Sequence, residues 1–108
     1  MAIKIALTSS DGKFIDKHFG KCEKFLIAEF NPKTGEYEIK ETREIERLCS
    51  DNGHTQAKLL NVIKLLSGCK YVITARIGVW VASELKLNGI IPIEFFGKTK
   101  DAFKQMGF

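Results

Sequence analysis

Two short segments of this chain carry side chains that commonly bind soft metals. Residues 15–22 read IDKHFGKC, with His18 four residues before Cys22, and residues 49–54 read CSDNGH, with Cys49 five residues before His54. Thiolates, and sometimes an imidazole, are the protein ligands of iron–sulfur clusters. The spacings match no standard zinc pattern, and the chain has no CxxC pair. If the two segments meet in the fold, up to four nitrogen and sulfur donors could converge.

The rest of the chain predicts an α/β fold that would hold these segments. Alternating or continuous apolar runs predict strands over 3–8, 24–30, 36–43, 70–75 and 90–95. Helical periodicity predicts helices from about 55 to Ser67-Gly68, over 79–88, and over 98–108 with Thr99 as the candidate N-cap. The order β-β-β-α-β-α-β-α predicts a mixed five-stranded sheet flanked by helices.

This order also predicts where a ligand would bind. In α/β sheets, ligands tend to lie beyond the carboxyl ends of the parallel strands. Those ends are TSSDG after the first strand, ARIG after the fourth and EFFGK after the fifth. The IDKHFGKC segment follows directly from the first of them, which places His18 near the predicted site.

Length and composition narrow the class of protein. The chain has 108 residues, of which 44% are hydrophobic, so we expect one domain over 1–108 with a real core. Three cysteines at irregular spacing favour free thiols in a reducing compartment, and we expect a cytoplasmic protein that has no membrane span. The net charge of +4 comes from scattered basic residues, so no arm for nucleic acid is indicated.

The residues also resemble a known family. DKHFGKCEKFLIAEF, a lone cysteine after the third strand, and GCKYVITARIGVWVASELKLNGI are similar to the dinitrogenase iron–molybdenum cofactor biosynthesis family. This NifX-like domain is also found fused to the C-terminus of NifB-type proteins. The resemblance covers essentially the whole chain and implies an α/β fold with a ribonuclease H-like topology. It also implies a small carrier of iron–sulfur or iron–molybdenum cluster precursors, with His18 and then Cys49 as its functional positions.

A carrier of this kind suggests roles for other residues near these segments. Clusters are anionic overall, so Arg76 and Lys17 could offset their charge. Gly20 would let the backbone approach a bulky ligand, and the helix start at Gly78 would offer N–H groups to an anion. We count the following as candidate binding residues: His18, Phe19, Gly20, Cys22, Cys49, Arg76 and Gly78.

Other potential site residues have simpler interpretations. Asp16 could orient the His18 ring. His54 is interpreted as a helix-start residue rather than a ligand, and whether Cys22 binds is left open. Cys69 follows the helix-ending Gly68 and is predicted to be a buried packing thiol.

Three functions compete at this stage. The first is a non-enzymatic cluster carrier that docks on donor and acceptor proteins, as a monomer or a weak homodimer. The second is a metal-dependent nuclease-like enzyme, suggested only by a ribonuclease H-like fold, although the first strand carries no carboxylate for two-metal chemistry. The third is a small regulatory or interaction module that uses an edge strand or Trp80. We favour the carrier because no nucleophile–base pair is evident.

Overall fold

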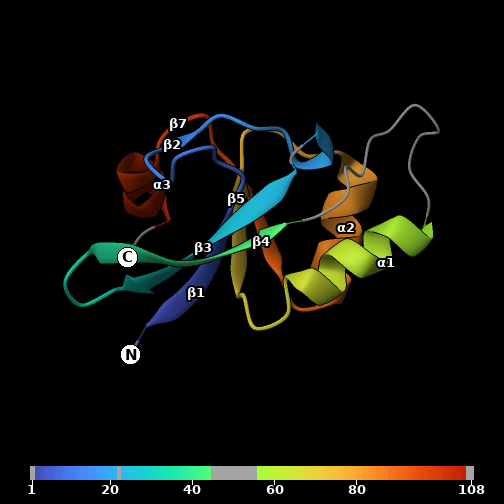
Figure 1. Ribbon diagram of the computed structural model, residues 1–108, viewed down its shortest axis with the longest axis horizontal. Helices are drawn as coiled ribbons and strands as arrows, with labels where there is room; N and C mark the ends of the chain where they lie inside the picture. Colours follow the sequence, from blue (N-terminus) through green and yellow to red (C-terminus); the bar gives the residue numbers. More distant parts are fainter. Residues whose placement is uncertain (1, 22, 45–55, 107–108) are drawn as a thin grey trace.

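The computed structural model describes residues 2–21, 23–44 and 56–106 (Figure 1). Its strands are β1 (Ile3–Leu7), β2 (Phe14–Ile15), β3 (Lys24–Asn31), β4 (Glu36–Glu44), β5 (Tyr71–Thr74), β6 (Ile91–Glu94) and β7 (Gly97–Lys98). Its helices are α1 (Gln56–Leu65), α2 (Val79–Leu87) and α3 (Thr99–Gln105), and a 3₁₀ turn, η1, spans Phe19–Lys21. Each of the long elements predicted from the sequence is present, with ends shifted by a few residues.

Five strands form one mixed sheet in the order β4-β3-β1-β5-β6. β3 pairs antiparallel with β1 and with β4, whereas β5 runs parallel to β1 and to β6. The predicted mixed five-stranded sheet is therefore confirmed, and the ribonuclease H-like topology stays a prediction. Because β1, β5 and β6 run the same way, their carboxyl ends lie at one edge, which we call the carboxyl end of the sheet.

Two apolar clusters cover the two faces of the sheet. Alternation along β1 sends Ala6 to one face and Ile5 and Leu7 to the other. The first cluster packs beneath α1 and α2, and the second beneath α3. Figure 1 shows α1 and α2 together on one side of the sheet and α3 on the other. Both faces of the central strands β1, β3 and β5 are thus largely buried, whereas the edge strand β4 is mostly exposed.

The sequence analysis missed a second, two-stranded sheet. β2 pairs antiparallel with β7, so that Phe14 lies opposite Lys98 and Ile15 opposite Gly97. Two-residue strands are too short to show a period, and this explains why the polar segment reads as a plain loop. Ile15 is fully buried, so the segment that leads to His18 is anchored in the core.

The N-cap of the last helix was also predicted one residue too late. Lys98 occupies the N-cap position of α3 with an extended backbone and makes no side-chain cap bond, and Thr99 is the first helical residue. Its backbone N–H donates to the carbonyl of Lys13 at 3.0 Å. The helix therefore begins directly from the β2–β7 pairing rather than from a hydroxyl cap.

Among the residues that the structure describes, no helix is both long and apolar enough to cross a bilayer.

Candidate functional site

The segment that carries His18 lies against the segment that follows β5. His18 and Arg76 form an isolated parallel β-bridge. The Phe19 N–H donates to the Arg76 carbonyl at 2.9 Å, and the Ala75 N–H donates to the Lys17 carbonyl at 3.1 Å. Residues paired in a ladder project to the same face, so the two side chains leave the backbone on the same side of this pairing. Fifty-eight positions apart in sequence, they meet at the carboxyl end of the sheet.

The three residues of the HFG motif differ in exposure. The His18 side chain is exposed, whereas only 1% of Phe19 is exposed. The Phe19 ring lies 5.5 Å from the Phe25 ring, between centroids, within the cluster beneath α1 and α2. Phe19 thus anchors the 3₁₀ turn η1 in the core, whereas the side chain of its neighbour His18 faces solvent. In the structure the Phe19 ring belongs to the core. Its predicted part in cluster binding stays a prediction.

Gly20 and Gly78 occupy different settings in the site. Gly20 is half-buried inside η1. Gly78 is the N-cap of α2, has an extended backbone and makes no side-chain cap bond. A Cβ added at Gly78 would meet no atom within 4 Å, so the space beside the first turn of α2 is open. The Ile77 N–H just before this turn already donates to the Glu94 carboxylate, so the open space lies at Gly78 itself.

Both cations and carboxylates lie near His18 at the carboxyl end of the sheet. Lys17 and Arg76 are exposed, and neither side chain has a hydrogen-bond or ion-pair partner among the described residues. Asp16 was predicted to orient His18, but it instead accepts hydrogen bonds from the Ser10 hydroxyl at 3.1 Å and the Ser10 N–H at 3.4 Å. Two cations at this end therefore face solvent, and the carboxylates of Asp16 and Glu94 are hydrogen-bonded to Ser10 and to the Ile77 N–H.

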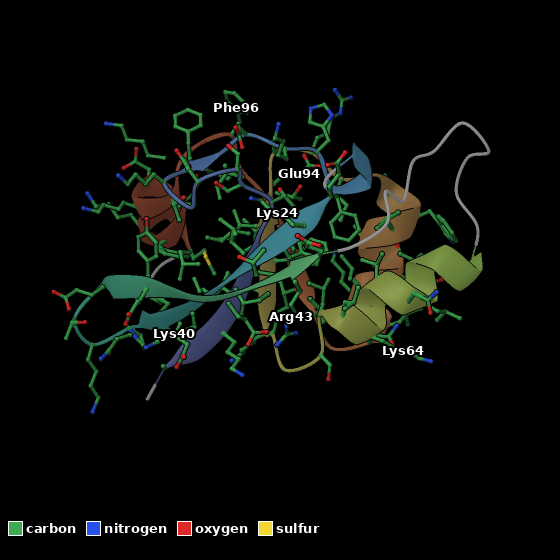
Figure 2. The ribbon with its side chains drawn as sticks, viewed as in Figure 1. Lys24, Lys40, Arg43, Lys64, Glu94 and Phe96 are labelled. Carbon is green, nitrogen blue, oxygen red and sulfur yellow. The ribbon has the colours of Figure 1, made fainter. Side chains whose placement is uncertain are left out.

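A contact that the sequence analysis missed links β6 to the start of α2. The Glu94 carboxylate accepts a hydrogen bond from the Ile77 N–H at 3.2 Å. Figure 2 shows Glu94 and Phe96 toward the same edge of the molecule, at the carboxyl end of the sheet. Phe96 is 69% exposed and packs edge-to-face on Phe14 with 5.5 Å between ring centroids. EFFGK was the only sequence signal for this part of the site.

The predicted thiolate ligands lie outside the described residues. This holds for Cys22 and Cys49, and also for His54. That residues 15–22 and 49–54 meet to bind a metal therefore stays a prediction. Within the parts of the chain that the structure describes, no group of three or more His, Cys, Asp or Glu side chains is placed to hold a metal ion. What the described residues provide is one exposed imidazole flanked by cations.

Cys69 is the cysteine that the structure does describe, and it lies elsewhere. It precedes β5 at the opposite end from Arg76, is 6% exposed, and packs in the cluster beneath α1 and α2. Burial raises the pKa of its thiol above the usual value, with a smaller opposing effect from Arg43. The prediction of a buried packing thiol is confirmed.

Fold and site together define a small α/β domain that presents an imidazole and cations at the carboxyl end of its sheet. The chain matches the family described as "Dinitrogenase iron-molybdenum cofactor" over residues 1–107, and it belongs to that family. The family resemblance read from the sequence is thereby confirmed, and with it a relation to iron–molybdenum cofactor biosynthesis and nitrogen fixation.

Individual relatives support the same assignment. The chain is 29% identical over 108 residues to "FeMo cofactor biosynthesis protein NifB" of Frankia alni, covering 97% of this chain but 21% of that protein. It is 31% identical over 93 residues to "Protein NifX" of Azotobacter vinelandii, covering 85% and 56% of the two chains. The chain thus spans about a fifth of the NifB relative and little more than half of the NifX relative.

A solved structure shows the same fold. The apo form of the orange protein from Desulfovibrio gigas superimposes with a TM-score of 0.62 at 18% identity, covering 98% of this chain and 88% of that chain. At this level of identity the likeness concerns the fold alone.

Proposed function

We propose that this chain is a non-enzymatic carrier that transiently binds an iron–sulfur or iron–molybdenum type cluster, or a precursor of one, at the carboxyl end of its sheet. The observation that carries the proposal is the backbone bridge between His18 and Arg76, two residues whose side chains are both exposed. Family membership supports the choice of cargo. A ribonuclease H-like topology is part of the proposal, and the strand order β4-β3-β1-β5-β6 supports it.

In this proposal His18 is the protein ligand that the described residues provide. An imidazole nitrogen is a good ligand for iron, and an exposed imidazole leaves room for a large inorganic cluster. Cys49 and, secondarily, Cys22 would supply thiolates. We expect one or two protein ligands in all, because a carrier must release its cargo to an acceptor.

The surrounding groups would bind the cargo through charge. Arg76 and Lys17 offer cations that no described carboxylate neutralises. Gly78, at the N-cap of α2, leaves open space next to the helix start for a bulky ligand. Gly20 keeps the turn next to His18 free of a side chain. These contacts favour a polyanion without enclosing it, which suits a cargo that is handed from a donor protein to an acceptor protein.

The competing functions have less support. A two-metal nuclease needs clustered carboxylates. The Asp16 carboxylate is hydrogen-bonded to Ser10 and the Glu94 carboxylate to the Ile77 N–H. Among the described residues, no three or more His, Cys, Asp or Glu side chains cluster to hold a metal ion. An interaction module remains compatible with the carrier, since the exposed Phe14–Phe96 pair lies at the same end of the molecule. We propose no nucleic-acid or membrane partner, and a monomer or weak homodimer.

The proposal is tested by anaerobic titration of the purified chain. The probes are a cluster reconstituted from ferrous iron and sulfide and, separately, extracted iron–molybdenum cofactor, each followed by visible absorption. We expect His18→Ala to weaken binding by roughly tenfold or more, and Arg76→Gln to weaken it less. Cys69→Ala is the matched control, because that thiol lies at the other end of β5.

Two results would contradict the proposal. Unchanged binding by both His18→Ala and Cys49→Ala would remove the site assignment. Cleavage of an RNA–DNA hybrid that depends on magnesium would instead favour the nuclease-like enzyme.

A further inference from the structure

Two threonines end the two central parallel strands at the carboxyl end of the sheet. Thr8 follows β1 and Thr74 is the last residue of β5, and both are fully buried. Their hydroxyl oxygens lie 2.9 Å apart although the residues are 66 positions apart in sequence. A buried hydroxyl is costly unless it is hydrogen-bonded, so the partners of this pair indicate what it does.

Those partners are the backbone carbonyls on either side of the site. The Lys17 carbonyl lies 2.8 Å from the Thr8 hydroxyl and 3.2 Å from the Thr74 hydroxyl. The Arg76 carbonyl lies 3.3 Å from the Thr74 hydroxyl. Each hydroxyl has a single proton, so the two protons are shared among the hydroxyl–hydroxyl contact and these two carbonyls.

The same two carbonyls accept the backbone bonds that flank His18. The Lys17 carbonyl accepts from the Ala75 N–H, and the Arg76 carbonyl accepts from the Phe19 N–H. The hydroxyls thus reinforce both sides of the bridge between His18 and Arg76. The hydroxyls lie in the interior of the protein, because the threonines are buried, whereas His18 and Arg76 are exposed.

We propose that Thr8 and Thr74 form a hydroxyl clamp that fixes the spacing of His18 and Arg76, and that both are positioning residues of the site. The role of that site in cluster binding rests on the function proposed above. The clamp itself is a property of this chain's fold and can be tested without any cargo.

Isosteric substitutions separate the hydroxyl from the packing of the side chain. Thr74→Val and Thr8→Val remove the oxygen and keep the shape, whereas Thr74→Ser keeps the oxygen. Each lost hydrogen bond is worth about 0.5–1.5 kcal/mol, which corresponds to roughly two- to tenfold faster opening of the local structure. The amides of Ala75 and Phe19 report this opening directly, because they make the two backbone bonds of the bridge.

The first measurement is amide hydrogen exchange by NMR. In Thr74→Val we expect the Ala75 and Phe19 amides to exchange roughly two- to tenfold faster relative to the amides of β1 and β3, with recovery in Thr74→Ser. Thr99→Val is the matched control. Thr99 is also fully buried, but among the described residues its hydroxyl makes no hydrogen bond to the Lys17 or Arg76 carbonyl. Unchanged relative exchange in both valine variants would overturn the clamp.

The second measurement is the cluster titration described above, applied to the same variants. Weaker binding in Thr74→Val that Thr74→Ser restores supports the positioning role. Faster exchange with unchanged cluster affinity overturns that role. If the unaltered chain binds neither probe, the proposed function fails, and the exchange data alone decide whether the clamp holds the two segments together.

Discussion

The two ends of β5 place a histidine and a cysteine in opposite settings. At the carboxyl end, His18 is bridged to Arg76 and both side chains face solvent. At the amino end, Cys69 is 6% exposed among apolar side chains. Both residue types bind iron, yet only the first is accessible. Burial, rather than residue type, separates a candidate ligand from a packing residue.

The two ends also use an arginine differently. Arg43 of β4 donates to the carbonyl of Leu65, the last residue of α1, and to that of Ser67 just beyond it, and it pairs with Glu41. Figure 2 shows Arg43 on the side of the molecule away from Glu94 and Phe96. Arg76 has no such side-chain partner among the described residues. One guanidinium completes a helix end, and the other is free to meet a ligand.

The largest expected change in the free energy of unfolding separates His18 and Phe19, two adjacent residues of the HFG motif. Phe19→Ala should lower the free energy of unfolding by about 3–5 kcal/mol, because it empties a core position next to Phe25. His18→Ala should change it by less than about 0.5 kcal/mol, because that side chain is exposed. Urea denaturation of both variants measures the difference. Equal losses would show that His18 is structural and would remove the contrast between the two ends of β5.

An intermediate effect should separate the two arginines. Arg43→Gln should cost about 1–2 kcal/mol of unfolding free energy, because carbonyls at the end of α1 lose a charged donor. Arg76→Gln should cost within about 0.5 kcal/mol. Thermal unfolding of the pair under identical conditions tests this. A larger loss in Arg76→Gln would show that its guanidinium supports the fold.

The smallest effect concerns the Cys69 thiol and pH. Burial raises the pKa of this thiol above its ordinary value of 9.0, so folding favours the protonated form. The stabilisation is fully present below the unfolded-state pKa and is lost as pH rises through the folded-state pKa. We therefore expect the stability of the unaltered chain, relative to Cys69→Ala, to fall above about pH 9. Denaturation at several pH values measures the difference, and a difference that grows with pH would contradict the burial of this thiol.

Several features could be predicted from the sequence because they depend on local order. Apolar alternation in 3–8 and 24–30 indicated β1 and β3, and helical spacing in 55–67 indicated α1. The β2–β7 pairing could not be predicted, because strands of two residues have no period. Cys69 was interpreted correctly as a packing residue from its place after Gly68, whereas the predicted link between Asp16 and His18 was replaced by one to Ser10.

The order of residues alone determined which segments form strands and helices, because that choice depends on the spacing of apolar side chains over a few positions. It also placed His18 after β1, at the end of the sheet where ligands tend to bind. Only the tertiary structure decided that His18 meets Arg76 and that Thr8 meets Thr74. Those contacts join residues 58 and 66 positions apart, and they form only when β1 and β5 pair in parallel with their ends aligned.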